Sequence, residues 1–138
     1  MVNKFYSIAA IIVVIDQLLK YIVRQFVTVA IPLTSFFSIS NIQNTGAGFG
    51  ILPGQRILLI LISLIVIVVI IKYFKKEKGL AQVSWALILG GAVGNVIDRI
   101  LFGSVTDFLA FSFWPAFNVA DMAVTVGVII LLWQYWKN

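Results

Sequence analysis

The chain has 138 residues, 62% of them hydrophobic, with a mean hydropathy of +1.08 and a net charge of +5. Such a composition cannot supply the polar surface of a soluble monomer, so the sequence indicates a single-domain membrane protein. The absence of cysteine and histidine excludes thiol nucleophiles, Ser-His-Asp triads and the commonest zinc sites. A hydrolase built from these residues would have to use carboxylates.

Four apolar blocks, at about 5–23, 57–74, 80–97 and 117–136, predict four transmembrane helices within one domain over residues 1–138. The predicted fold class is an all-α membrane protein. Lysines cluster in the loop at 72–78, which the positive-inside rule places in the cytoplasm. Both termini are then expected in the cytoplasm as well, and the positive charge indicates topology and not nucleic-acid binding.

The first block begins like a signal peptide, but no small-x-small cleavage site follows it, so we expect a retained span. Asp16 and Lys20 lie four residues apart, which places a carboxylate and an ammonium on one helix face. Two interpretations remain open for this pair. It is either a structural ion pair that locks helices together, or one of the two side chains contacts a substrate.

The segment between the first two blocks is polar and rich in β-forming residues. It predicts a small extracytoplasmic β-sheet at about 25–55, on the membrane surface. The segment contains the glycine-rich run Asn44-Thr-Gly-Ala-Gly-Phe-Gly50, which no Gly-Lys-Ser/Thr follows, so it is not a phosphate loop. A glycine-rich turn alone is usually only a turn, and Asn44 is its candidate functional residue.

The last two blocks carry the remaining polar candidates. Gly90-Gly-Ala-Val-Gly94 has small residues four apart, which favours close packing of another helix. Asn95, Asp98 and Arg99 are expected to emerge at the outer end of the third span, with Asp107 in the outer loop beyond. Asn118 and Asp121 form a capping pattern at the start of the fourth span. The helix dipole favours a carboxylate there even without any chemistry.

All the aspartates are therefore expected at one membrane level. A charge inside the bilayer costs about 2.5 to 3.5 kcal/mol, so such residues are functional candidates. Asp16 has Lys20 as a partner, and Asp98 has Arg99 or a residue on another helix. The other two, Asp107 and Asp121, have no basic residue nearby in sequence. They suggest a pair that shares one proton, as in aspartic proteases, and activates a water for attack on a peptide carbonyl.

Two alternatives come from other functional classes. A subunit of an ion- or proton-coupled membrane transporter would also hold carboxylates in the membrane, but a proton relay should distribute them through its depth. A structural membrane protein would use aspartates only to cap and pair helices. That interpretation leaves Asp107 without a partner.

Five motifs in order resemble those of the bacterial lipoprotein signal peptidase family, also called signal peptidase II. They are Asp16-Gln-x-x-Lys20, Asn44-Thr-Gly46-Ala, Gly94-Asn95-x-x-Asp98-Arg99, Val105-Thr-Asp107-Phe and Phe117-Asn118-x-Ala-Asp121. The resemblance covers nearly the whole chain. It implies an intramembrane aspartyl endopeptidase of the bacterial cytoplasmic (inner) membrane, with its active site at the extracytoplasmic side. The enzyme would cut prolipoproteins just before their diacylglyceryl-modified cysteine.

The resemblance also implies residue roles. Asp107 and Asp121 would be the catalytic pair. The substrate-binding or supporting residues would be Asp16, Lys20, Asn44, Gly46, Asn95, Asp98, Arg99 and Asn118. We expect diacylglyceryl-prolipoprotein substrates, a phospholipid bilayer around the protein, globomycin-like inhibitors, no nucleic acid, no cofactor or metal, and a monomer. The chain departs from the family pattern at Gly48, where a second alanine is usual, and at Thr106, where valine is usual.

Overall fold

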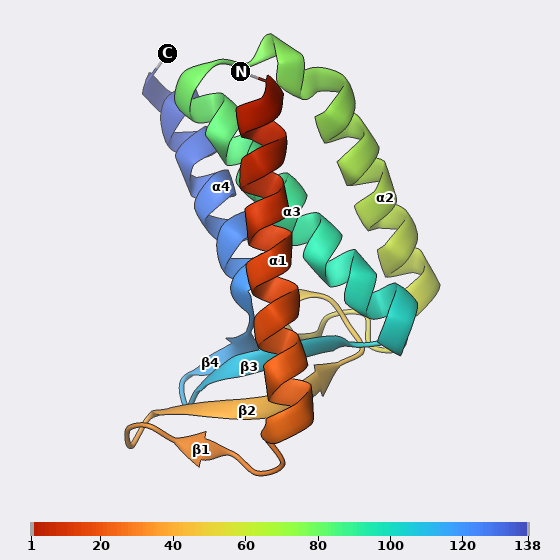
Figure 1. The fold of residues 1–138 in the computed structure, drawn as a ribbon, viewed down its shortest axis with the longest axis vertical. Helices are drawn as coiled ribbons and strands as arrows, with labels where there is room; N and C mark the ends of the chain where they lie inside the picture. The colour runs from red at the N-terminus through yellow and green to blue at the C-terminus, as the bar shows by residue number, and fades with distance from the viewer. Residues whose placement is uncertain (1, 138) are drawn as a thin grey trace.

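Four long helices stand side by side, and a small sheet closes one end of the bundle (Figure 1). The computed structural model describes residues 2–137. The helices are α1 (Val2–Phe26), α2 (Arg56–Tyr73), α3 (Gly79–Phe102) and α4 (Val119–Lys137), with short 3-10 turns η1 (Gly48–Gly50) and η2 (Phe74–Lys76). Each long helix is apolar and long enough to cross a membrane. The four predicted helices are therefore present as candidate membrane spans.

Helix α3 packs against α1 on one side and α4 on the other, and glycines allow both contacts. A Cβ atom at Gly90 would lie 2.8 Å from the carbonyl oxygen of Ala9 in α1. A Cβ atom at Gly91 would collide with the carbonyl oxygen of Ala120 in α4. The packing interpretation of this glycine-rich stretch is confirmed, because Gly90 and Gly91 each face the backbone of a neighbouring helix.

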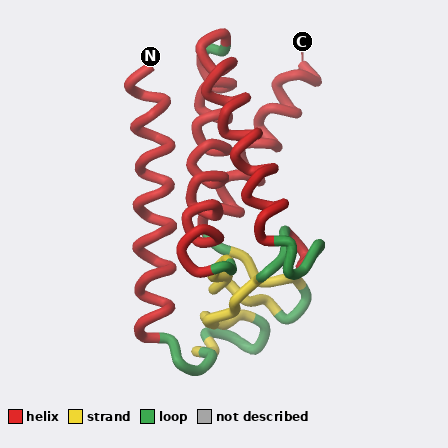
Figure 2. Tube along the Cα trace, turned by 90° about the vertical axis from the view of Figure 1, so that its right-hand side faces the viewer, coloured by secondary structure: helices red, strands yellow, loops and turns green. Residues whose placement is uncertain are grey.

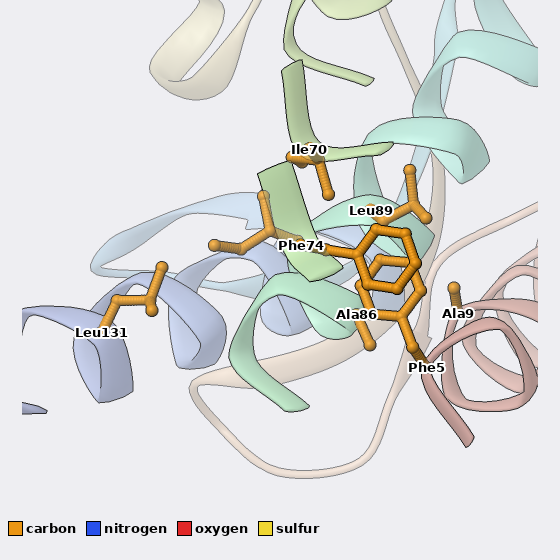
Figure 3. Packing of buried hydrophobic residues seen from close by; sticks show 8 residues of the cluster. Phe5, Ala9, Ile70, Phe74, Ala86, Leu89 and Leu131 are labelled. Atoms are coloured by element: carbon orange, nitrogen blue, oxygen red, sulfur yellow. The ribbon is translucent and has the colours of Figure 1, made fainter. Parts of the chain in front are cut away.

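A cluster of buried apolar side chains holds the end of the bundle that is remote from the sheet (Figure 3). Its centre is a stacked pair, Phe5 of α1 and Phe74 of η2, with ring centroids 3.8 Å apart. The other buried members are Ala9, Ile70, Ala86, Ile88, Leu89 and Leu131. The aromatic pair therefore ties the connection after α2 to the start of α1.

The sheet contains four antiparallel strands in the order β1 (Ile31–Pro32), β2 (Phe37–Asn44), β3 (Val105–Phe111) and β4 (Trp114–Phe117). In the turned view the strands lie together below the helices (Figure 2). The predicted sheet between the first two spans thus forms, but half of its strands come from the segment between α3 and α4. The expectation that Asp107 lies in a loop is wrong. Asp107 lies on β3 and is paired with Ile42 of β2.

Helix α3 also extends past its predicted end at residue 97. It continues to Phe102 and stops at Gly103, whose φ of 78° is in the left-handed region that favours glycine. Asp98 and Arg99 therefore lie in the last turns of the helix. The apolar pattern underestimates the helix because these charged residues interrupt it.

Replacement of Gly91 by alanine should destabilise the bundle, since the new Cβ would collide with the α4 backbone. We expect a loss of about 1–3 kcal/mol in the free energy of unfolding, measured as a lower unfolding temperature in detergent. Gly48→Ala is the matched control, because no atom lies within 4 Å of a Cβ atom built there. An unchanged unfolding temperature for Gly91→Ala would show that the helices separate easily.

Candidate active site

A fully buried lysine lies where α1 meets α3. The ammonium nitrogen of Lys20 is 2.7 Å from Oδ2 of Asp16 and 3.4 Å from Oδ2 of Asp98. It also donates a hydrogen bond to Oδ1 of Asn95 at 3.0 Å. The three donor protons of the ammonium thus have three acceptors. The predicted pair of Asp16 and Lys20 is confirmed as an ion pair, and Asp98 pairs with residues of α1 and not with Arg99.

The two carboxylates beside Lys20 also hold the starts of two other elements. Oδ1 of Asp16 accepts the backbone N–H of Ala120 at 2.8 Å, in the first turn of α4. Oδ2 of Asp98 accepts the backbone N–H of Thr106 at 3.0 Å, in β3. Because Asp107 follows Thr106 and Asp121 follows Ala120, the buried ion cluster fixes the backbone beside both candidate catalytic residues.

Arg24 is a supporting residue that the sequence analysis missed. Its guanidinium lies 3.5 Å from Oδ2 of Asp98, donates to the hydroxyl of Thr106 at 3.1 Å, and stacks over the ring of Phe102. The signal was available, because Asp16, Lys20 and Arg24 follow one another at intervals of four on a single helix face. Gln17, whose Nε2 donates to Oδ1 of Asp98 at 2.9 Å, completes this cluster.

Asparagine side chains connect the two candidate catalytic carboxylates. The side-chain amide of Asn118 donates to Oδ1 of Asp107 at 2.8 Å, and the backbone N–H of Asn118 donates to Oδ2 of Asp121 at 3.3 Å. Asn44 donates to Oδ2 of Asp107 at 3.2 Å, and Asn95 donates to Oδ1 of Asp121 at 2.9 Å. The structure therefore brings Asp107 and Asp121 to one place, where Asn118 contacts both.

Asn118 also caps α4. Its Oδ1 accepts the backbone N–H of Asp121 at 2.9 Å, while Asp121 accepts the backbone N–H of Asn118. The predicted reciprocal cap is thus present. This cap orients the Asn118 side chain, so that its oxygen faces the helix and its amide group faces Asp107.

Asp107 lies on β3, outside the membrane-spanning helices, and its side chain is 3% exposed. Burial raises the pKa of Asp107 to about 7, and the negative charge of Asp121 adds to the rise. Hydrogen bonds from Asn44 and Asn118 act in the opposite direction and lower this pKa. Asp107 can consequently hold a proton close to neutral pH, as an acid that works beside an ionised carboxylate must.

A cavity of about 630 Å³ opens beside Asp121. Its walls come from η1, α2, α3, β4 and α4, and most of the lining residues are apolar, among them Ile62, Val66, Ile88, Met122 and Val126. Asn95, Arg99 and Asp121 provide polar groups in this apolar wall. Helix α2 therefore supplies one side of the cavity.

Arg99 has a hydrogen-bond donor to spare in this wall. Its guanidinium donates to the carbonyl oxygen of Gly46 at 3.2 Å, while its buried Nε has no partner within residues 2–137. A Cβ atom at Gly46 would lie 2.6 Å from the carbonyl oxygen of Ile51, so the turn needs glycine at this position. The turn at Gly46 therefore positions the guanidinium of Arg99, which donates to its carbonyl oxygen.

Two aromatic residues also line this cavity. Phe49 of η1 and Trp114 of β4 contact edge to face, with ring centroids 5.2 Å apart, and both are exposed. Phe49 has a φ of 60°, an uncommon conformation for a residue with a side chain. The sequence analysis did not single out Phe49, because an aromatic residue between two glycines carries no periodic signal.

The chain is similar to known proteins along most of its length. The sequence model of the family described as signal peptidase (SPase) II matches residues 8–137. A lipoprotein signal peptidase of Halothermothrix orenii is 42% identical, over 96% of this chain and 95% of the relative. One of Moorella thermoacetica is 41% identical, over 94% of this chain and 91% of the relative. A solved bacterial membrane enzyme superimposes with a TM-score of 0.93 at 31% identity, covering 99% of this chain and 90% of that one.

Replacement of Lys20 by methionine should destabilise the protein strongly, because it removes the ammonium between two buried carboxylates and leaves Asp16 without a counter-charge. We expect a loss of about 3–5 kcal/mol in the free energy of unfolding, measured by thermal unfolding in detergent. Arg24→Met is the comparison. Its side chain is 15% exposed, so we expect a smaller loss. Equal losses in the two variants would contradict a special role for the buried ammonium.

Proposed function

The chain belongs to the signal peptidase II family, whose members are membrane proteases that remove signal peptides from prolipoproteins, and we propose Asp107 and Asp121 as its catalytic pair. Because the chain belongs to this family, we conclude that it is a protease and not a transporter subunit or a structural membrane protein. The proposed cleavage point is the peptide bond before the diacylglyceryl-modified cysteine of the substrate.

The assignment of the proposed pair rests on how the two carboxylates lie relative to Asn118 and to the cavity. Asn118 contacts both carboxylates, and Asp121 lies on the wall of the apolar cavity. A lipid-modified peptide that enters the cavity from the bilayer would therefore meet a carboxylate at its inner wall. The apolar side chains there match acyl chains and the hydrophobic segment of a signal peptide.

The two carboxylates have different surroundings, which suggests different roles. Asp107 is the more buried and, with its raised pKa, is the proposed proton holder. Asp121 would act as the general base. It takes a proton from a water whose oxygen bonds to the scissile carbonyl carbon, while Asp107 donates its proton to the carbonyl oxygen. When the C–N bond breaks, Asp121 returns its proton to the leaving amine and the hydroxyl proton goes back to Asp107.

Asn95 and Arg99 would position the substrate. Both lie on the cavity wall, and the guanidinium of Arg99 can donate to a peptide carbonyl. The supporting residues would be Asp16, Lys20 and Asp98. They would position the catalytic pair indirectly, through the backbone N–H groups of Ala120 and Thr106. Globomycin-like cyclic peptides would compete with the substrate for this cavity.

The proposed location is the bacterial inner membrane, with the carboxylates at the extracytoplasmic side. The support is the distribution of charge. Lys4 near the start of α1, Lys137 at the end of α4 and the lysines of the turn around η2 lie at the bundle end opposite the sheet (Figure 1). The interfacial aromatic residues Tyr73, Trp133, Tyr135 and Trp136 belong to the same helix ends. We propose that the protein works there as a monomer.

Replacement of either proposed catalytic aspartate by asparagine should abolish cleavage, because an amide of the same shape can neither take nor hold the proton. We expect Asp107→Asn and Asp121→Asn each to lower the rate by about 10²- to 10⁴-fold. The assay is cleavage of a diacylglyceryl-modified prolipoprotein by the purified protein. Glu77→Gln, which changes the acid next to the η2 turn, is the control and should retain activity. Parent-like activity in either asparagine variant, shown to be folded, would rule out that carboxylate.

The rate should also depend on the proton of Asp107. Because the pKa of Asp107 is raised to about 7, the acid form is present below that pH and is lost above it. We therefore expect kcat/KM to fall on the alkaline side with an apparent pKa near 7. Asn44→Ala removes a hydrogen bond that lowers this pKa, so the fall should move to higher pH. A pH profile that Asn44→Ala leaves in place would argue that another group sets it.

A further inference from the structure

Two of the long helices carry a single hydroxyl group in an otherwise apolar run. Between the charged residues near its two ends, α2 has Ser63 as its only polar side chain. In α4, Thr125 is the only polar side chain between Asp121 and Gln134. A hydroxyl inside a spanning helix normally finds a local partner, because it can donate to the carbonyl oxygen four residues earlier in the same helix.

Neither hydroxyl has this local partner. Two other helical serines do: the hydroxyls of Ser7 and Ser84 donate to the carbonyl oxygens four residues earlier, at 2.7 Å and 3.0 Å. Within residues 2–137, Ser63 and Thr125 make no such bond, and both line the cavity of about 630 Å³. Both hydroxyls are therefore available to an occupant of the cavity.

The two hydroxyls lie deeper in the bundle than the proposed catalytic pair. Both α2 and α4 begin at the sheet end and run away from it (Figure 1). Thr125 follows Asp121 by one helical turn, which places it about 6 Å farther from the sheet on the same face of α4. Ser63 comes about two turns after Arg56, whose guanidinium donates to the carbonyl oxygen of Arg99 at 2.7 Å. The cavity thus has an outer polar level and an inner one.

A peptide that is held for cleavage in this cavity needs donors at the inner level. A peptide bond that a carboxylate and a water attack must be unwound from any helix, so the residues beside it lose their intrahelical hydrogen bonds. In apolar surroundings an unmet backbone group costs free energy. The apolar lining residues Ile62, Val66 and Ile88 have no side-chain donor to offer. The two hydroxyls supply what these residues lack.

We propose that the hydroxyls of Ser63 and Thr125 form a subsite that binds main-chain carbonyl oxygens of the signal peptide, an inference that rests on the proposed function of the cavity. An extended chain advances about 3.3–3.6 Å per residue. The spacing of about 6 Å between Asp121 and Thr125 along α4 therefore places this contact roughly two residues before the scissile bond. Because hydroxyls that bind the main chain do not distinguish side chains, the subsite accepts signal peptides of different sequence.

The test compares cleavage kinetics with the binding of a labelled synthetic signal peptide that carries no lipid, followed by fluorescence anisotropy, for the purified full chain in detergent. Thr125→Val and Ser63→Ala each remove one hydroxyl. We expect each to raise KM and the Kd of the peptide about three- to tenfold, the loss of one hydrogen bond, with kcat nearly unchanged. Thr125→Ser keeps the hydroxyl and should stay near the parent. Ser7→Ala, which removes a hydroxyl bonded within its own helix, is the matched control.

Three results would overturn the subsite. The first is a parent-like KM and Kd in both hydroxyl-free variants. The second is a Thr125→Ser variant that behaves like Thr125→Val, because side-chain volume would then decide. The third is a raised KM with a normal Kd for the lipid-free peptide, which would assign the hydroxyls to the ester carbonyls of the diacylglyceryl group.

Thermal unfolding separates this role from a structural one. Since neither hydroxyl donates to its own helix, both variants should unfold at the temperature of the parent. The Kd of the lipid-free peptide needs no cleavage, so it tests the subsite even if Asp107→Asn and Asp121→Asn show that the proposed catalytic pair is wrong.

Discussion

The buried ammonium of Lys20 is the interaction on which the rest of the structure depends. It lies between the carboxylates of Asp16 and Asp98, and all three side chains are inaccessible to solvent. A buried ion pair contributes little net stability, whereas the removal of one member is costly because an unpaired charge remains. The cluster thus acts less as a source of stability than as a constraint. It allows α1 and α3 to meet in only one way.

This constraint reaches the proposed catalytic pair through the backbone. The carboxylates of Asp98 and Asp16 also accept backbone N–H groups at the starts of β3 and α4. The backbone beside Asp107 on β3 and beside Asp121 on α4 is thereby held in place by the ion cluster around Lys20 of α1. Asn118 then completes the arrangement, because its helix cap and its bond to Asp107 use the two ends of one side chain.

Short-range patterns in the sequence predicted the features that depend on neighbours in the chain. The four-residue spacing of Asp16 and Lys20, the cap of Asn118 and Asp121, and the glycines of α3 all follow from helix geometry, and the structure contains them. The partners of Asp98 could not be predicted from spacing along the chain. Lys20 and Arg24 lie on another helix, and only the packed bundle brings them together.

The strands β3 and β4 show the same limit. Residues 105–111 include β-branched and aromatic side chains, but a strand needs a partner, and that partner is β2 on the far side of two helices in the sequence. The 630 Å³ cavity is likewise made by five separate elements. Family motifs located the proposed site residues, whereas physical patterns alone predicted a common depth in the membrane and not their contacts.

The pairing of β2 with β3 has a consequence for the order of synthesis. Asn44 and Asp107 contact each other across 63 residues of chain, so β2 leaves the ribosome long before its partner exists. Contacts of this range form late in folding. Asn118 and Asp121 come later still, at the start of the final helix. A nascent chain therefore lacks the complete proposed catalytic pair while its earlier helices enter the membrane, and on this proposal the activity arises only when the last span is in place.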